Sequence, residues 1–221
     1  MIYPIVLYGD PILRRRASPV KDFGPDLATL AQDMIETMYA ADGVGLAAPQ
    51  IGLPLRMFVA IEVAGRQDDD ALEGQVMDEP DADELTPEQK RSAWGVVAEH
   101  VIVNPTITLS DDKQLGRDGC LSLPGLSVED VPRAQSVVLE YQDVSGQPHR
   151  LEAEGYFAHV LQHEYDHLEG VLYFDHLPAD RRESFLTENR STLAAWQREA
   201  RALAKERSSA RAVRAAPSGR S

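Results

Sequence analysis

Hydrophobic residues recur along the chain with two spacings, which predict helices near both ends and strands between them. Leu27, Leu30 and Met34 follow at helical spacing, and Gly43 comes next as a residue that ends a helix. Between residues 55 and 61, apolar residues alternate with others, as in a strand. Because the strands fall in one block flanked by helices, we expect an α+β fold. The pattern predicts helices over 25–40, 155–170 and 179–205, and strands over 55–61, 101–103, 106–109 and 136–141.

Composition and charge exclude several classes of protein. The 221 residues include 22 Lys or Arg and 36 Asp or Glu, so the formal net charge is −14. This charge argues against a protein dedicated to DNA or to an anionic membrane surface. The single cysteine excludes a disulfide-stapled scaffold. No apolar run approaches the roughly 18 residues of a membrane span, and no signal peptide is evident. We therefore expect a cytoplasmic protein with neither a DNA nor a membrane partner.

The charges are unevenly placed, which indicates how the chain is organised. Residues 66–91 hold ten acidic and three basic side chains, a local balance of −7. Such a segment has little apolar area to offset its ordering entropy, so we expect an acidic insertion at about 64–98 that forms an extended surface loop. Residues 198–221 instead hold seven Lys or Arg and two Glu. We expect one domain over 1–205 and a basic tail without regular structure over 206–221.

The segment from His163 to His167 has the spacing of a metal site. Two histidines at positions i and i+4 lie on one helix face, where both imidazoles can reach one ion. Glu164 lies beside the open coordination position, where it can accept a proton from water. A helical projection places all three side chains on the apolar face of the helix over 155–170. A carboxylate there is costly without a compensating charge, which a metal ion supplies.

A third ligand must come from another part of the chain. The position where a metzincin has its third histidine holds Tyr173. His159 is too far along the same straight helix, about 12 Å from His167, and we place it at the polar rim. Cys120 remains: it is either a small buried apolar residue or the third ligand, and the neighbouring helix favours the ligand. The other three histidines are expected at the surface: His100, His149 and His176.

A third segment, residues 43–52, contains glycines, small apolar residues and Gln50. A helix end followed by a turn explains the glycines but not the glutamine. Together, the three segments resemble the signature motifs of the peptide deformylases, in the same order. Residues 43–50 match G-x-G-x-A-A-x-Q, and residues 162–167 match Q-H-E-x-D-H. Residues 118–122 match E-G-C-L-S except that Asp118 replaces the glutamate, and the resemblance extends over roughly residues 5–177.

The resemblance implies a fold, an activity and a cofactor. The fold is α+β, with antiparallel or mixed β-sheets around a central metal-binding helix, followed by a C-terminal helix. The activity is metal-dependent hydrolysis that removes the N-formyl group from the initiator methionine of nascent polypeptides, giving formate and a free amino terminus. The family uses one divalent ion, typically Fe²⁺ in the cell and often Ni²⁺, Co²⁺ or Zn²⁺ in purified protein. A Cys-His-His set alone does not distinguish iron from zinc.

The resemblance also implies a role for individual residues. Glu164 accepts the proton of the attacking water and later delivers one to the leaving amine, while the side-chain amide of Gln50 and the backbone N–H of Leu121 hold the oxyanion. The implied metal ligands are Cys120, His163 and His167, the substrate-binding residues are Val44, Gly45, Gly119 and His159, and the residues behind the ligands are Asp118, Asp166 and Arg133. The shorter Asp118 leaves open whether Arg133 is its partner.

Two other functions compete with this interpretation. A zinc endopeptidase would use the same helix with Glu183 or Glu188 as its third ligand, but it would leave Gln50 and Cys120 without a role. A non-catalytic metal-binding protein would not need Glu164. The basic tail suggests a further partner, since it can contact ribosomal RNA phosphates near the point where nascent chains emerge. A solvated tail without a partner is the competing hypothesis.

Overall fold

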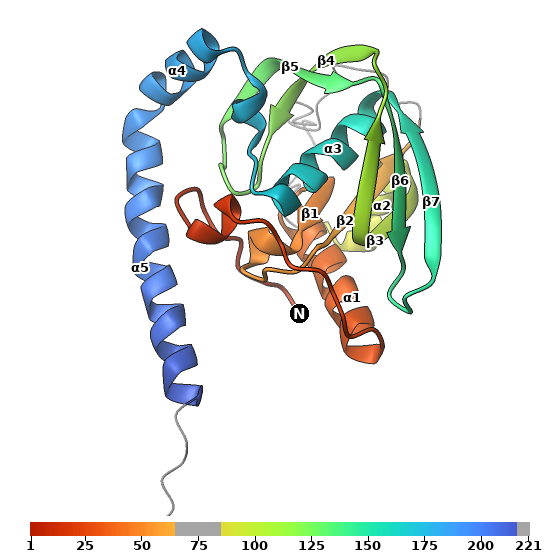
Figure 1. Cartoon of the computed structure of the whole chain (residues 1–221), viewed down its shortest axis with the longest axis horizontal. Coiled ribbons are helices and arrows are strands. Elements are labelled where there is room, and N and C mark those ends of the chain that lie inside the picture. The colour runs from red at the N-terminus through yellow and green to blue at the C-terminus, as the bar shows by residue number, and fades with distance from the viewer. Residues whose placement is uncertain (65–84, 216–221) are drawn as a thin grey trace, which may run out of the picture.

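The computed structural model describes residues 1–64 and 85–215 and contains two antiparallel sheets (Figure 1). The larger sheet has five strands in the order β1-β2-β3-β6-β7, and the smaller one pairs β4 with β5. The strands are β1 (Gly45–Ala47), β2 (Met57–Val63), β3 (Val96–Leu109), β4 (Lys113–Gly119), β5 (Ser127–Ala134), β6 (Ser136–Gln142) and β7 (Pro148–Glu154). All pairs within both sheets are antiparallel, and with the helices they confirm the predicted α+β class.

Five α-helices and three short 3₁₀ helices accompany the sheets in the described ranges. The α-helices are α1 (Pro25–Ala40), α2 (Pro87–Ala93), α3 (Gly155–Glu169), α4 (Ala179–Glu188) and α5 (Arg190–Ala215). The 3₁₀ helices are η1 (Pro11–Arg14), η2 (Ala48–Ile51) and η4 (Tyr173–His176). None of the helices within these ranges is long and apolar enough to cross a membrane.

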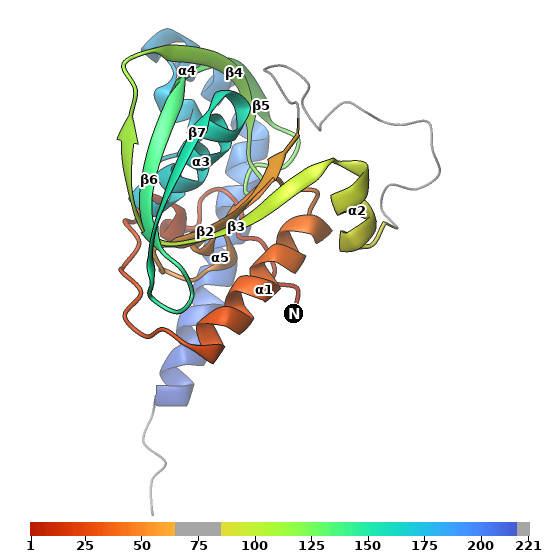
Figure 2. The same ribbon diagram turned by 90° about the vertical axis from the view of Figure 1, so that its right-hand side faces the viewer.

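Strand β2 is the centre of the core because both of its faces are covered. Met57 and Val59 pack with residues of α1, while Phe58 and Ala60 pack with residues of α3. All four side chains are buried, so the strand is a nearly continuous apolar run. Figure 2 shows α1 outside the curve of the strands and α3 within it. The helix that carries the His-Glu-His segment is therefore enclosed in the molecule.

The predicted helices over 25–40 and 155–170 are confirmed as α1 and α3, and the predicted strand at 55–61 is β2. The two strands expected at 101–103 and 106–109 are one strand, β3, whose register shifts between Val103 and Thr106. Asn104 adopts a left-handed backbone at this shift, with φ of 51°. The intervening Asn104-Pro105 pair therefore makes the strand irregular but does not end it.

Two expectations about the charged segments were wrong in part. The acidic insertion expected at 64–98 is not an extended loop throughout, because Thr86 caps α2 and Val96 already begins β3. Residues 65–84 of that insertion lie outside the described residues. The helix expected over 179–205 is two helices that meet at Asn189, and α5 continues to Ala215. Residues 206–215 are thus helical rather than irregular, and 216–221 lie outside the description.

Candidate metal centre and active site

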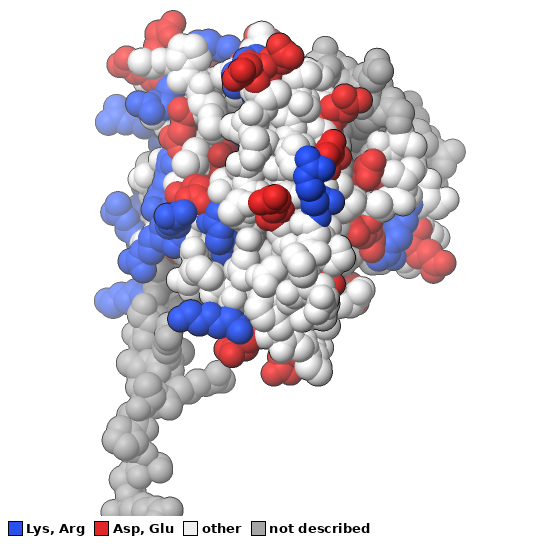
Figure 3. All heavy atoms as spheres, turned by 45° about the vertical axis from the view of Figure 1, so that its right-hand side comes forward, with Lys and Arg blue, Asp and Glu red and all other residues white. Residues whose placement is uncertain are grey.

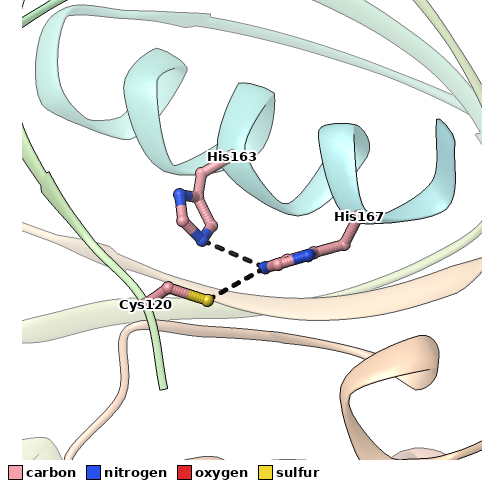
Figure 4. A group of neighbouring side chains, drawn as sticks. All are labelled: Cys120, His163 and His167. Carbon is pink, nitrogen blue, oxygen red and sulfur yellow. Dashed lines mark hydrogen bonds between the residues drawn. The ribbon is translucent and has the colours of Figure 1, made fainter. Parts of the chain in front are cut away.

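The structure brings together the side chains of Cys120, His163 and His167 (Figure 4). Both histidines are on α3, and the cysteine follows directly after the last residue of β4. Nε2 of His167 lies 3.2 Å from Nε2 of His163 and 3.3 Å from Sγ of Cys120. All three ligand atoms lie within 4.8 Å of one another, so they converge on one point.

These distances and donor atoms fit a metal ion. In a tetrahedral site with metal–nitrogen bonds of about 2.0 Å and a metal–sulfur bond of about 2.3 Å, neighbouring ligand atoms are about 3.3 to 3.6 Å apart. Two imidazoles and a thiolate are ligands that zinc, iron and nickel all accept. With only three protein ligands, such a site keeps a position for water or substrate, as catalytic sites do. The buried cluster can therefore hold a divalent ion.

Asp118, at the end of β4, links the ligand His163 to a buried arginine. Its Oδ1 accepts from Nδ1 of His163 at 2.7 Å, and its Oδ2 accepts from Nη2 of Arg133 at 2.7 Å. The side chains of Asp118 and Arg133 are 4% and 2% exposed. Burial acts to raise the pKa of Asp118, but the charges of His163 and Arg133 hold this pKa well below its usual range. Arg133 is thus the partner of the shorter carboxylate.

His159 is not at a polar rim, as its place on the helical projection suggested, but is 6% exposed. Its Nε2 lies 3.1 Å from Oδ2 of Asp118. The position is enclosed because β4 passes over this side of α3: a Cβ added to Gly116 would lie 2.9 Å from Nδ1 of His159. The prediction failed because the projection assumed that only one face of α3 is covered.

Asp166 lies behind the ligands and contacts Arg133 and His176. Nε2 of His176 lies 2.7 Å from Oδ2 of Asp166. Arg133 therefore joins Asp118 and Asp166, two carboxylates that flank the helix and the loop of the ligands. This pairing connects β5, the end of β4 and the polar side of α3 behind the cluster.

Glu164 lies beside the cluster and is 3% exposed. Gly45 of β1 packs directly against it, since a Cβ on this glycine would lie 2.7 Å from Cγ of Glu164. Among the described residues, Oε2 of Glu164 has no hydrogen-bond partner. Burial raises the pKa of Glu164 to about 7, against the opposing charges of His163 and His167. A carboxyl with this pKa suits both uptake and release of a proton near neutral pH.

The protonation of the ligands themselves depends on their mutual contacts. Burial acts to raise the pKa of Cys120, but the charge of His167 and hydrogen bonds from both histidines lower this pKa to about 5. At His163, burial acts to lower the pKa, but the charge of Asp118 raises the pKa well above its usual value. The cluster thus favours a thiolate, which is the form of cysteine that binds metals.

Gln50 and Leu121 lie next to Cys120, from two different segments. Gln50 is 1% exposed on η2, and its Oε1 accepts from the backbone N–H of Ala47 at 2.7 Å. This bond fixes the orientation of the amide, whose Nε2 lies 3.5 Å from Sγ of Cys120. Leu121 stands in the turn closed by the bond from the N–H of Leu123 to the carbonyl of Cys120. Both residues flank the thiol.

A cavity of about 440 Å³ opens onto this site. The four residues expected to bind substrate all line it: Val44, Gly45, Gly119 and His159. Sequence reasoning missed several other lining residues, among them Asp42, Gly116 and Tyr156. A signal for two of them was present, because Asp42 directly precedes the glycine-rich segment and Gly116 lies two residues before Asp118.

A thiolate and two imidazoles around one point, with a buried carboxyl beside them at a cavity, define a hydrolase of the metal-dependent class. The family model of polypeptide deformylases matches residues 2–183. A peptide deformylase of Thermus thermophilus is 51% identical over 206 residues, which cover 93% of this chain and 98% of that protein. A peptide deformylase of Brucella suis is 39% identical over 183 residues, which cover 82% of this chain and 88% of that protein. The chain belongs to the peptide deformylase family, and it is an enzyme.

Solved structures agree with this assignment. The crystal structure of peptide deformylase from Thermus thermophilus is similar with a TM-score of 0.73 and 46% identity, over 90% of this chain and 99% of that one. The crystal structure of peptide deformylase from Plasmodium falciparum is similar with a TM-score of 0.69 and 30% identity, over 90% of this chain and 98% of that one. The predicted fold and the predicted removal of N-formyl groups are therefore confirmed at the level of the family, and neither competing function is supported.

Proposed function

We propose that this enzyme hydrolyses the N-formyl group of the initiator methionine on nascent polypeptides, giving formate and a free amino terminus. The observation that carries the proposal is the Cys120-His163-His167 cluster with Glu164 beside it at the cavity. Cys120, His163 and His167 would hold a divalent ion, which would supply Lewis-acid chemistry and would lower the pKa of water at the site. We propose Fe²⁺ as this ion in the cell, with Ni²⁺, Co²⁺ or Zn²⁺ as substitutes in purified protein.

Glu164 moves the proton in this reaction. With its pKa raised to about 7 by burial, its carboxylate accepts a proton from the attacking water and then delivers one to the leaving amine nitrogen. No hydrogen bond from a described residue occupies Oε2 of Glu164. That oxygen is therefore available to the water and the substrate.

Two donors stabilise the oxyanion, which is the formyl oxygen after water has added to the formyl carbon. They are Nε2 of Gln50, fixed by the bond from Ala47 to its Oε1, and the backbone N–H of Leu121. Because the amide of Gln50 is already held by Ala47, its donor needs no change of rotamer during the reaction. Removing one such donor costs about 10²–10³ in turnover.

The cavity orients the peptide. β1 is an edge strand of the larger sheet, so Gly45 offers backbone groups to an extended peptide that adds to this edge. The methionine side chain enters the cavity between Val44 and His159, both of which line it. Gly119 and Leu121 complete the lining beside Cys120.

The structure favours this assignment over an endopeptidase. An endopeptidase would use Glu183 or Glu188 as its third ligand, and both acids are exposed on α4. The group of metal-binding side chains in the described part of the chain contains Cys120 and neither of these acids. A third ligand from α4 is therefore not needed to complete the site.

We also propose an electrostatic contact with ribosomal RNA, through α5 as well as the tail. Arg190, Arg198, Arg201 and Lys205 are exposed on this helix, and Figure 3 shows Lys and Arg side chains gathered on its side of the molecule. Gln substitution of Arg198, Arg201 and Lys205 should weaken salt-sensitive co-sedimentation with ribosomes and leave turnover of small peptides unchanged. Equal co-sedimentation across salt concentrations would rule out this contact.

Metal analysis of anaerobically purified protein, combined with a formate-release assay on a formyl-methionyl peptide, tests the proposed function. We expect one equivalent of iron and stoichiometric formate. Because a ferrous ion and a thiolate are both oxidisable, activity should decay in air and persist after nickel replacement. Absence of formate from protein with full metal content would overturn the function, and equal stability of the iron and nickel forms in air would overturn only the choice of metal.

A further inference from the structure

Lys90 is a buried cation outside the site described so far. It lies on α2 and is 4% exposed. Its ammonium group donates to the backbone carbonyl of Tyr39 at 2.8 Å and to Oδ1 of Asp42 at 2.5 Å. A lysine is almost never buried without such partners, because its charge must be compensated. The contact therefore fastens α2 to the C-terminal end of α1.

Two further contacts join α2 to this end of α1. Trp94, which ends α2, packs on the ring of Tyr39 with 5.7 Å between ring centroids. The hydroxyl of Tyr39 donates to Oε1 of Glu99 at 2.7 Å, and the same carboxylate pairs with Arg91. The cation of Lys90 is also favourable at this place because carbonyls at a helix C-terminus carry partial negative charge. Several independent contacts thus hold α2 against the last turn of α1.

Asp42 connects the contact with Lys90 to the cavity. It has a left-handed backbone, with φ of 56°, and it lines the cavity next to Gly43, Val44 and Gly45. Gly43 packs so closely on Leu121 that an added Cβ would lie 2.8 Å from its Cδ1. The backbone of Asp42 therefore leads directly into the edge that meets the peptide, and the next residue, Gly43, packs on the side chain of Leu121.

We propose that Lys90 is a positioning residue for peptide binding, which acts by holding Asp42 in the conformation that starts the Gly43–Gly45 segment. The inference rests on the proposed function for the role of that segment. α2 lies in the part of the chain that the sequence suggested was a surface loop, and it becomes a support of the substrate site. The carboxylate of Asp42 is 54% exposed, so its contact with Lys90 fixes the loop and is not needed to neutralise the acid.

The test compares Lys90→Met with Arg91→Met in the full-length, metal-loaded enzyme. Methionine keeps the length and apolar stem of Lys90 but cannot hold Asp42. Arg91→Met removes the neighbouring cation and its pairing with Glu99, which also holds α2 against α1, but it leaves the contact between Lys90 and Asp42 in place. We expect Lys90→Met to raise KM for a formyl-methionyl tripeptide about tenfold with kcat within about twofold, since ground state and transition state lose the same binding. The dissociation constant of the deformylated methionyl tripeptide, from calorimetry, should rise by the same factor, and Arg91→Met should change neither.

A double-mutant cycle separates positioning from general stability. Asp42→Gly keeps the left-handed backbone accessible and removes the acceptor of Lys90. It should raise KM by itself and add little to Lys90→Met, because both changes break one contact. If Lys90→Met does not fold, the peptide affinity of Asp42→Gly decides the question alone. Unchanged KM and peptide affinity, or fully additive effects, would overturn the proposal; a wild-type enzyme that binds the peptide but releases no formate would overturn the proposed function instead.

Discussion

Oδ1 of Asp118 accepts the Nδ1 hydrogen of His163 at 2.7 Å, and this bond decides which nitrogen of His163 faces Cys120. With Nδ1 donating, Nε2 keeps its lone pair for a metal ion. The carboxylate that selects this tautomer is itself held by Arg133 at 2.7 Å. The geometry of the ligand set thus depends on a carboxylate that binds no metal.

Asp118→Asn should lower metal affinity about 10–100-fold, because an amide holds the imidazole less strongly. Chelator competition measures this affinity. Asp166→Asn is the matched control: it also removes a carboxylate from Arg133, but Asp166 has no contact with Nδ1 of His163. Equal affinities for the two variants would show that the contact with His163 has no effect.

Gly116→Ala should destabilise the protein, because the new Cβ would lie 2.9 Å from Nδ1 and 3.1 Å from Cε1 of the enclosed His159. Overpacking of this kind costs about 1–3 kcal/mol, and thermal unfolding measures it. His159 also lines the cavity, so kcat/KM should fall. Adding His159→Ala should restore part of the stability by making room. A Gly116→Ala protein as stable as the wild type would refute the packing argument.

Removal of the metal should lower the melting temperature. An ion at 1,000 times its dissociation constant stabilises the folded state by about 4 kcal/mol, and each kcal/mol shifts the melting temperature of a chain this size by about 2–4 °C. The difference between metal-loaded and chelator-treated protein should therefore be roughly 10 °C by calorimetry. Cys120→Ala should show a much smaller difference; the same difference in that variant would remove Cys120 from the ligand set.

Glu164→Gln should keep the metal and lose turnover by about 10²–10⁴, because glutamine has the size of glutamate but cannot accept the proton. Metal content and kcat are measured on the same preparation. Glu169→Gln, at the end of the same helix, should leave kcat unchanged, since Glu169 contacts Arg56 and Arg16. Turnover of Glu164→Gln near the wild-type value would assign the proton transfer to another group.

The elements that could be predicted from the sequence are those with strong apolar periodicity. α1, α3 and β2 have it, and they form the core. β4 could not be found in this way, because the strand from Lys113 to Gly119 contains a single large apolar residue, Leu115, which is 58% exposed. α2 was hidden in an acidic run, although Thr86 and Gln89 form a capping box that marks its start.

The ligand histidines could be predicted because their spacing alone brings them to one helix face. The prediction of Cys120 as a metal ligand depended on the family resemblance, since no local sequence pattern distinguishes a ligand thiol from a buried one. The surroundings of His159 could not be predicted, because they come from β4, which approaches at Gly116 from a distant part of the sequence. The same holds for Lys90, whose partners, Tyr39 and Asp42, lie 51 and 48 positions earlier in the chain.

The most direct test of the account compares three substrates of the metal-loaded enzyme. Gly45 packs so closely on Glu164 that a Cβ on this glycine would lie 2.7 Å from Cγ of Glu164. We expect the space beside Glu164 and the metal ligands to admit the single hydrogen of a formyl carbon more readily than the methyl group of an acetyl carbon. We predict rapid formate release from a formyl-methionyl peptide, much slower release of acetate from the acetyl analogue, and no cleavage of casein. Cleavage of casein that is abolished by Glu164→Gln would contradict the account.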